Sequence, residues 1–352
     1  RGTILGPYSE TMAQVRSHPK SLVTGGAGFI GSHVTDGLLS AGHDVVVLDD
    51  LSAGYLDNVN PRAEFVEGSI TDADLIDSLF EHHPFAYVFH LAAYAAEGLS
   101  HFIRRFNYNN NLIGSVTLIN AAVRHQCRCF VFTSSIAVYG ALQTPMTEEM
   151  TPRPEDPYGV AKLAVELDLA AARHMFGLNY VVFRPHNVYG ERQNTADKYR
   201  NVIGIFMNQI MQGLPCTIFG DGSQTRAFSH IADVAPAIVR SISIPAAYNR
   251  VFNIGADIPY TVLDLAERVQ RVMGRQTGIR CLPARNEVIH AFCDHAKARD
   301  VLGYEPAVAL DEGLERMARW ALRVGPRASR DFEGIEIEKG MPPAWVSPCT
   351  KA

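Results

Sequence analysis

Tyr158 and Lys162 lie four residues apart in Pro157–Lys162, a spacing that puts both side chains on one face of a helix, one turn apart. A free phenol, with a pKa of about 10, is a poor base at neutral pH. A nearby ammonium group or another positive charge favours the phenolate. The pair therefore predicts a tyrosinate that removes a proton from a hydroxyl group. Ser135 follows the apolar run Phe130–Thr133 and is placed to hydrogen-bond the same oxygen.

A glycine-rich segment is the second chemical signal. Gly25, Gly28 and Gly31 follow the apolar run Ser21–Thr24 at GxxGxxG spacing. Between a strand and a helix, such glycines permit a tight turn, and backbone N–H groups and the helix dipole then favour a pyrophosphate. Asp49 ends the next apolar run. A carboxylate there accepts hydrogen bonds from an adenosine ribose and repels a 2′-phosphate, so the pattern predicts NAD rather than NADP.

The elements that must position these residues follow from the alternation of short apolar runs with longer helical patterns. Continuous apolar strands separated by helices indicate a parallel sheet covered on both faces. The order therefore predicts an α/β, Rossmann-type doubly wound fold. The predicted strands are Ser21–Thr24, Val45–Leu48, Glu64–Val66, Tyr87–Leu91, Phe130–Thr133, Tyr180–Phe183 and, in a later return to the sheet, Val251–Gly255.

The rhythm changes after Asn187, where polar loops and shorter helices predict a smaller C-terminal α/β substrate domain. The predicted helices are Val202–Gln212, Thr261–Met273 and Leu310–Val324. We expect the NAD-binding domain over residues 18–187 and 230–256, and the substrate domain over 188–229 and 257–325. Residues 1–17 and 326–352 are expected to be tails, of which the second wraps the surface or is mobile.

The composition excludes several classes of protein. Of the 352 residues, 47% are hydrophobic and 20% are charged, and the formal net charge is −5. The apolar content suffices for one large core or two modest ones, and the charge balance argues against nucleic acid or an anionic membrane as a partner. No apolar run reaches the length of about 18 residues that a membrane-spanning helix needs. The N-terminus also lacks the apolar stretch of a signal peptide.

The cysteine spacing matches neither a zinc site nor a disulfide framework. We therefore expect structural thiols, no metal, and a reducing cytoplasmic compartment. The six cysteines are Cys127, Cys129, Cys216, Cys281, Cys293 and Cys349.

Together the motifs resemble the extended short-chain dehydrogenase/reductase family, the nucleotide-sugar epimerases and dehydratases, from Lys20 to Val324. The matching segments are TGGAGFIG (Thr24–Gly31), HLAA (His90–Ala93), FTSSIAVYG (Phe132–Gly140), PYGVAK (Pro157–Lys162), RPHNVYGER (Arg184–Arg192), IFGDG (Ile218–Gly222), TRAFSHIADVA (Thr225–Ala235) and ARNEV (Ala284–Val288). The resemblance implies Ser135, Tyr158 and Lys162 as the catalytic set. It also implies a homodimer formed through helices near Phe102–His125 and Tyr158–Phe176.

The resemblance implies NAD that is tightly bound and regenerated in each turnover. The residues implied for NAD are Gly25, Gly28, Phe29, Ile30, Gly31, Asp49, Asp50, Ser52, Gly54, Ser69, Ile70, Leu91, Ala92, Ala93, Asn110, Tyr158, Lys162 and Pro185. The family more often has aspartate where Ser69 stands.

A UDP-sugar is the substrate that the resemblance implies. It assigns Asn187, Asn201, Arg226 and Arg285 to the diphosphate, Glu287 to the ribose, and Thr217 and Phe219 to the uracil. Two arginines suit a pyrophosphate because they form forked, charge-assisted hydrogen bonds. The implied substrate-binding set is Ser135, Asn187, Arg192, Asn201, Val202, Thr217, Phe219, Arg226, Arg285 and Glu287.

The two residues after Ser135 distinguish between reactions of the family. Sugar 4,6-dehydratases carry an Asp-Glu pair there, and decarboxylases that make UDP-xylose carry glutamate at the second position. Here the positions hold Ile136 and Ala137, neither of which moves a proton. The resemblance then implies a 4-epimerase. Tyr158 takes the O4 proton while the C4 hydride passes to NAD, and the 4-keto sugar turns its other face to receive the hydride back.

Arg192 bears on the identity of the sugar. UDP-glucuronate 4-epimerases have an arginine in a similar Tyr-Gly-x-Arg-Gln setting, here Tyr189–Gln193, where a guanidinium near C6 could pair with the uronate carboxylate. Many dehydratases share Gly-x-Arg, so an arginine that anchors the loop is the alternative. Ala291 adds little bulk to the sugar pocket. We expect UDP-glucuronate first, giving UDP-galacturonate, then UDP-glucose, then UDP-N-acetylglucosamine.

Two other readings remain open at this point. A non-catalytic NAD-binding regulator could share the fold, although the chain keeps both Tyr158 and Lys162. The second alternative is a net dehydrogenase, which exchanges its NAD with the solvent.

Overall fold

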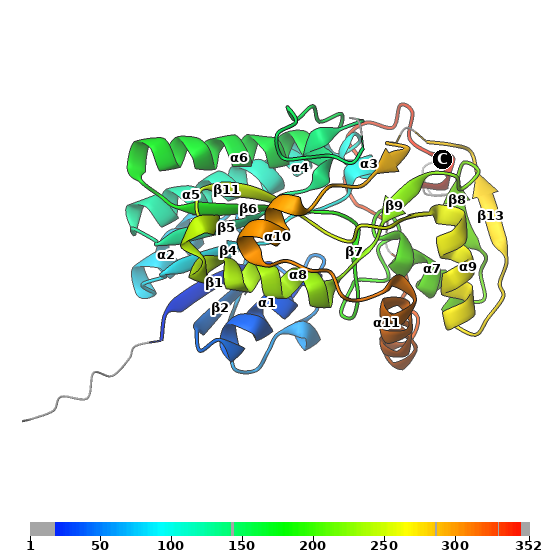
Figure 1. Cartoon of the computed structure of the whole chain (residues 1–352), viewed down its shortest axis with the longest axis horizontal. Helices are drawn as coiled ribbons and strands as arrows, with labels where there is room; N and C mark the ends of the chain where they lie inside the picture. The colour runs from blue at the N-terminus through cyan, green and yellow to red at the C-terminus, as the bar shows by residue number, and fades with distance from the viewer. Residues whose placement is uncertain (1–17, 142–143, 286, 330, 346–352) are drawn as a thin grey trace, which may run out of the picture.

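The computed structural model describes residues 18–141, 144–285, 287–329 and 331–345. A seven-stranded sheet lies at its centre in the order β11-β6-β5-β4-β1-β2-β3, and all neighbouring strands are parallel (Figure 1). The strands are β1 (Lys20–Thr24), β2 (Asp44–Asp49), β3 (Glu64–Glu67), β4 (Tyr87–His90), β5 (Cys129–Thr133), β6 (Tyr180–Pro185) and β11 (Arg250–Ile254). The strand order reverses beside β1, which is where doubly wound folds bind ligands. The predicted fold class is confirmed.

Helices cover both faces because alternate side chains of a buried strand point to opposite sides. Val23 and Val47 pack with α1, α8 and α10 on one face, whereas Leu22 and Val46 pack with α2, α5 and α6 on the other. Their bounds are α1 (Phe29–Ser40), α2 (Ala73–His82), α5 (Gly114–Arg124), α6 (Pro157–Phe176), α8 (Ile231–Arg240) and α10 (Ala296–Leu302). The predicted strands agree with those observed to within two residues at each end.

A second hydrophobic core forms to one side of the sheet, on the right in Figure 1. It is enclosed by α7 (Val202–Met211), α9 (Val262–Val272) and α11 (Leu310–Val324). Short strand pairs complete this lobe: β7 (Val188–Tyr189) with β10 (Ser229–His230), β8 (Cys216–Phe219) with β13 (Ile279–Leu282), and β9 (Thr225–Ala227) with β12 (Pro259–Thr261) and β14 (His290–Ala291). The three helices predicted after Asn187 are observed within a residue or so of their expected ends.

Two short helices follow β4 and precede α5. These are α3 (Glu97–Ser100) and α4 (Arg104–Tyr108), and a π-helical turn, η2 (Asn109–Ile113), joins α4 to α5. Two single turns flank the same region, η1 (Leu56–Asn58) after β2 and η3 (Ile136–Tyr139) after β5. Further turns are η4 (Ser241–Ser243), η5 (Pro245–Ala247) and η6 (Pro343–Trp345).

The segment after α11 wraps the surface, which is one of the two behaviours expected for it. Its carbonyl at Arg327 accepts a hydrogen bond from the Asn208 side chain at 2.9 Å. Glu336 accepts hydrogen bonds from the backbone N–H groups of Arg105 and Phe106 at 2.8 and 2.9 Å. Trp345, which is 4% exposed, ends the described part of the segment beside α3 and β8. We name residues 326–329 and 331–345 the C-terminal strap, because this segment contacts both lobes.

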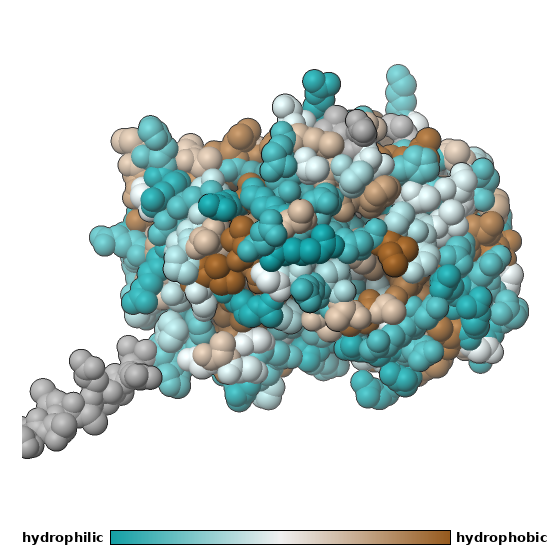
Figure 2. Space-filling view, in the orientation of Figure 1, coloured by the Kyte–Doolittle hydropathy of each residue, from teal (hydrophilic) through white to brown (hydrophobic). Residues whose placement is uncertain are grey.

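The face seen in Figure 2 is mostly hydrophilic, with apolar residues scattered over it. In the part of the chain that the structure describes, no helix has the length and apolar character needed to cross a membrane.

Candidate active site

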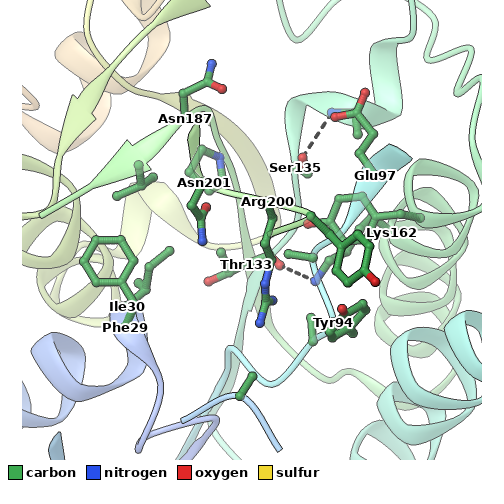
Figure 3. A pocket seen from close by; sticks show the side chains of 18 of the residues that line it. Phe29, Ile30, Tyr94, Glu97, Thr133, Ser135, Lys162, Asn187, Arg200 and Asn201 are labelled. Carbon is green, nitrogen blue, oxygen red and sulfur yellow. Dashed lines mark hydrogen bonds between the residues drawn. The ribbon is translucent and has the colours of Figure 1, made fainter. Parts of the chain in front are cut away.

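A cleft of about 600 Å³ lies at the carboxyl ends of the strands and is lined by both lobes. All the residues predicted for NAD line it, and so does every predicted substrate residue except Arg192. Figure 3 shows Phe29 and Ile30 on one side of this cleft and Ser135, Glu97 and Lys162 on the other. The fold therefore brings together residues that lie far apart in the sequence.

The glycine segment forms the floor of the cleft through close backbone contacts. Gly25 has a φ of +72°, and a Cβ atom there would lie 2.7 Å from the backbone nitrogen of Ala92. A Cβ atom on Gly31 would lie 2.0 Å from the Gly25 carbonyl oxygen. Gly28 is the N-cap of α1, so the free N–H groups of the first helical turn face this end of the cleft. This turn fits the pyrophosphate of a dinucleotide.

Asp49 ends β2 and is 8% exposed. Its carboxylate accepts hydrogen bonds from the backbone nitrogens of Ala27 at 3.0 Å and Leu51 at 2.9 Å, which ties the strand end to the glycine turn. Burial raises the pKa of Asp49, and these backbone hydrogen bonds oppose that rise. Each carboxylate oxygen keeps a further acceptor site. A buried acceptor beside a phosphate-binding turn fits an adenosine ribose, so the residues present fit NAD.

Tyr158 and Lys162 lie on the first turns of α6, which begins after Asp156. The Asp156 carboxylate caps the helix by accepting a hydrogen bond from the Gly159 nitrogen at 2.9 Å. Both side chains are buried, at 7% and 2% exposure. Lys162 Nζ donates to the Thr133 carbonyl at 2.8 Å and lies 5.8 Å from the centre of the Tyr158 ring. The spacing of four residues thus positions the pair as the sequence predicted.

The protonation of this pair differs from the sequence-based expectation. Burial raises the pKa of Tyr158 above its ordinary value, although a hydrogen bond with Ser135 lowers it in part. Burial also lowers the pKa of Lys162 to about 7. Burial is the largest influence on the Tyr158 pKa, and Glu97 and Asp156 raise it further. In the protein alone, the phenol is therefore not held acidic, and the amine beside it is deprived of solvent and bonded to a carbonyl.

A buried polar network behind α6 was missed by the sequence analysis. Glu166, four residues after Lys162, accepts hydrogen bonds from Ser134 and from Arg184, whose Nε lies at 3.0 Å. Arg184 also donates to the Tyr139 hydroxyl at 2.7 Å. The network joins β6 to α6 directly beside Ser135. Two residues could have indicated this network in the sequence. They are Glu166, one helical turn after Lys162, and Arg184, the first residue of RPHNVYGER.

Arg192 requires a correction. Its guanidinium forms an ion pair with Asp36 of α1 at 2.8 Å, and it does not line the cleft. Arg192 has a φ of +69°, in the left-handed region, so the chain turns at this residue. The backbone carbonyl of Arg192 accepts from Asn58 at 3.4 Å. The predicted pairing of Arg192 with a sugar carboxylate is therefore wrong, and the loop-anchoring alternative fits the structure.

Arg226 and Arg285 lie at the other end of the cleft. Arg226 donates from Nη1 to the carbonyls of Thr225 and Ile289, both at 2.8 Å, and from Nη2 to that of Val288. One Nη2–H and the Nε–H remain for other partners. The Glu287 carboxylate lies 3.0 Å from Arg285 and 3.8 Å from Arg226. Two guanidinium groups in a partly buried site are suited to a diphosphate.

The lining residues that were missed from the sequence include an aromatic, an acidic and a basic side chain. Tyr94 and Glu97 follow the HLAA motif, and Arg200 precedes α7. The Arg200 guanidinium lies 4.8 Å from the centre of the Tyr94 ring, and its Nε donates to Asp197 at 2.6 Å. No periodic or motif signal marked them, since each stands in a loop or at a helix end.

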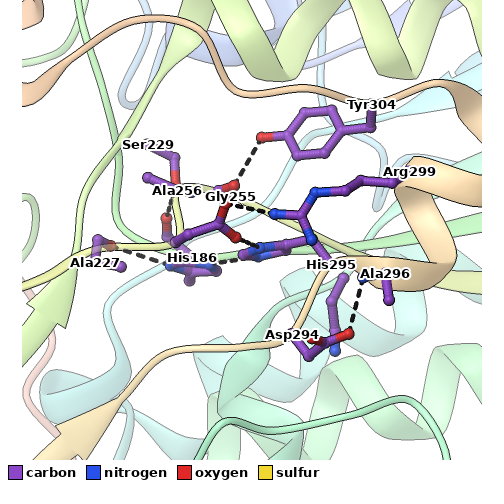
Figure 4. Close-up of polar contacts among 12 residues, drawn as sticks. His186, Ala227, Ser229, Gly255, Ala256, Asp294, His295, Ala296, Arg299 and Tyr304 are labelled. Carbon is purple, nitrogen blue, oxygen red and sulfur yellow. Dashed lines mark hydrogen bonds and ion pairs between the residues drawn. The ribbon is translucent and has the colours of Figure 1, made fainter.

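His186 also lines the cleft and is held by a chain of buried polar groups (Figure 4). Its Nδ1 lies 3.1 Å from the Ala227 carbonyl, and its Nε2 lies 3.0 Å from His295 Nε2. His295 Nδ1 lies 2.8 Å from the Asp257 carboxylate. Burial lowers the pKa of His186 to about 3, so the ring is neutral. Its Nδ1 donates to the carbonyl, and this bond together with the contact to His295 fixes the backbone between the implied NAD and substrate residues Pro185 and Asn187.

Comparisons with known proteins identify the family. Residues 21–255 match the model of the NAD dependent epimerase/dehydratase family. A UDP-glucose 4-epimerase of Mycolicibacterium smegmatis is 37% identical over 305 residues, which cover 84% of this chain and 96% of that protein. The structure is similar to a UDP-glucose 4-epimerase from Thermotoga maritima crystallised with UDP-glucose, with a TM-score of 0.83 and 36% identity over 87% of this chain and 99% of that one.

A UDP-glucuronic acid 4-epimerase from Bacillus cereus, crystallised with UDP-glucuronic acid and NAD, is also similar. Its TM-score is 0.80 and its identity 29%, over 87% of this chain and 99% of that one. The resemblance expected from the motifs is therefore confirmed. The chain belongs to the NAD-dependent epimerase/dehydratase family, and it is an NAD-dependent enzyme of the isomerase class.

Proposed function

We propose that this protein is a 4-epimerase of UDP-hexoses that interconverts UDP-glucose and UDP-galactose. One observation carries the proposal: Ser135, Tyr158 and Lys162 share a single cleft with the residues that fit NAD and with two arginines suited to a diphosphate. Ile136 and Ala137, which also line the cleft, bring no acid or base for elimination of water. The presence of the complete catalytic set argues against a non-catalytic regulator.

In the proposed reaction, Tyr158 transfers the proton, and Ser135 and Lys162 support it. Tyr158 takes the proton of the sugar O4 as the carbon is oxidised and returns it after reduction from the other face. Ser135, which lines the cleft with Tyr158 and lowers the pKa of its phenol in part, is placed to orient that phenol. NAD, when bound, supplies a hydride acceptor and donor and a positive charge near the phenol, and a positive charge favours the phenolate. Lys162 and the Thr133 carbonyl hold this face of α6 against β5.

The charges in the cleft support a choice among the candidate sugars. The arginine expected to pair with a uronate is bonded to Asp36 outside the cleft. Arg200 lines the cleft, but its charge is balanced by Asp197. Glu97 adds a carboxylate to the same lining. These charges favour a neutral hexose. UDP-glucuronate is the second candidate, because of the likeness to the Bacillus cereus enzyme.

The test uses purified protein without added NAD and supplies UDP-glucose, UDP-galactose, UDP-glucuronate or UDP-N-acetylglucosamine separately. Products are resolved by chromatography and identified by NMR. We expect UDP-glucose and UDP-galactose to interconvert. Tyr158→Phe, which removes one hydroxyl from a packed ring, should lose at least about 100-fold in kcat while keeping the wild-type melting curve. A 4-keto-6-deoxy product, or normal turnover by Tyr158→Phe, would contradict the proposal.

We also propose that the two lobes act as the NAD-binding and substrate domains at the expected boundaries. The expected homodimer stays a prediction. Exposed apolar residues on α6 and one just before α5 support it: Ile113, Val160, Leu167, Met175 and Phe176. Sedimentation of the purified protein tests it.

A further inference from the structure

Glu97 is a carboxylate in the cleft to which the family resemblance assigns no role. Glu97 is the first residue of α3. Its side chain is exposed to the cleft, and other parts of the protein lie around the cleft at this point (Figure 3). Among the residues that the structure describes, none forms a hydrogen bond or ion pair with this carboxylate. Its acceptor sites are therefore available to a bound molecule.

The position of α3 relative to the catalytic tyrosine is tightly constrained. The Ser100 hydroxyl donates to the Glu97 carbonyl at 2.6 Å and accepts from the backbone nitrogen of Tyr158 at 3.2 Å. Gly98 packs under Trp345, since a Cβ atom on Gly98 would lie 3.1 Å from the indole. The backbone of Glu97 is thus fixed between α6 and the C-terminal strap.

In the proposed complex, the hexose lies beside Glu97. Glu97 is close enough to act electrostatically on Tyr158 and on both Arg226 and Arg285. In the proposed reaction the sugar joins a diphosphate held by the arginines to a carbon that reacts at Tyr158. Its ring therefore occupies the space between these groups, and Glu97 borders that space.

We propose that Glu97 is the residue that selects the sugar: it accepts a hydrogen bond from a hydroxyl of a neutral hexose and repels the carboxylate of a uronate. This inference rests on the proposed function, because it assumes that a UDP-hexose occupies the cleft. A hydroxyl can donate to Glu97, whereas a uronate carboxylate at the same place brings two like charges together in the cleft.

Other charged groups around Glu97 shape its response to pH. Asp156 and Glu287 face it as like charges, and Arg226 and Arg285 face it as opposite charges. Burial, followed by Asp156, raises the pKa of Glu97 to about 7. The carboxyl group therefore ionises around neutral pH, and its repulsion of a uronate should strengthen as the pH rises.

The experiment compares kcat/KM for UDP-glucose and UDP-glucuronate from pH 6 to pH 9 in wild type, Glu97→Gln and Glu155→Gln. Glutamine keeps the shape of the side chain and an acceptor oxygen but removes the charge. We expect the wild-type preference for UDP-glucose to grow about tenfold over this range, and Glu97→Gln to lower the preference at pH 8 by about tenfold and make it independent of pH. Glu155→Gln removes a different carboxylate of the cleft lining, and it should leave the preference as in wild type.

A second measurement separates failure of this inference from failure of the proposed function. Calorimetry with Tyr158→Phe, alone and combined with Glu97→Gln, reports the affinity for UDP-glucose and UDP-glucuronate without turnover. If wild type epimerises neither sugar but the Glu97→Gln change still shifts the relative affinity, the function is wrong and the selecting role stands. The inference is overturned if Glu97→Gln leaves the preference for UDP-glucose over UDP-glucuronate unchanged in both turnover and binding. It is also overturned if neither sugar binds.

Discussion

Lys162 shows how burial changes the chemistry of a residue whose position the spacing had already indicated. The amine contacts the Thr133 carbonyl and lies over the Phe132 ring at 4.6 Å. Loss of solvent lowers its pKa to about 7, and the nearby Glu166 carboxylate opposes this. In the protein without nucleotide, Lys162 is therefore only partly protonated at neutral pH.

This pKa predicts how stability depends on pH. An unfolded lysine keeps its proton up to a pKa of about 10.4, whereas folded Lys162 releases it near pH 7. Between these values the unfolded chain binds more protons, so stability rises with pH. Relative to Lys162→Met, wild type without nucleotide should gain about 2–4 °C in Tm from pH 7 to pH 9. The exposed control Lys339→Met should show no such trend, and a constant difference for Lys162→Met would contradict the lowered pKa.

At the scale of elements, the contact between α1 and β1 depends on the absence of side chains at the glycines. A Cβ atom on Gly31 would lie 2.0 Å from the Gly25 carbonyl oxygen, so α1 must move away from the turn to admit one. That movement would withdraw the N–H groups at Gly28 from a pyrophosphate.

Gly31→Ala should therefore cost about 1–3 kcal/mol of stability through overpacking and should also abolish co-purified NAD. Gly42→Ala is the matched control, because Gly42 follows α1 in open space with a φ of +84°. It should cost about 1 kcal/mol through backbone strain and leave NAD in place. NAD content is measured by absorbance after acid release, and stability by urea unfolding. Equal NAD content in the two variants would refute the role of the close contact.

At the scale of the whole molecule, the C-terminal strap contacts both lobes. It lies at the end of the cleft that is implied for the UDP part of the substrate. Arg327 lies over the Tyr55 ring at 3.7 Å, and Glu336 accepts hydrogen bonds from the start of α4. Trp345 packs beside Phe219 and lies 5.5 Å from the Arg285 guanidinium. The strap thus supports two residues implied for the uracil and the diphosphate.

Trp345→Ala should weaken the binding of UDP by about tenfold, because Arg285 and Phe219 lose their support. Trp320→Ala is the matched control, since Trp320 packs at the edge of the second core and does not line the cleft. It should lower Tm without changing UDP affinity. Calorimetry with UDP and thermal unfolding measure the two effects. Unchanged UDP affinity in Trp345→Ala would show that the strap does not support the nucleotide end.

The sequence by itself determined the sheet, the glycine turn and the Tyr158–Lys162 pair, because these depend on periodicity and spacing within one or two adjacent elements. The family resemblance of its motifs also implied many of the residues that line the cleft. Only the tertiary structure decided where Arg192 points, which carboxylate enters the cleft at Glu97, and how strongly Lys162 is deprived of solvent. Each of these depends on partners from distant segments, such as Asp36 for Arg192, and on the burial that their packing creates.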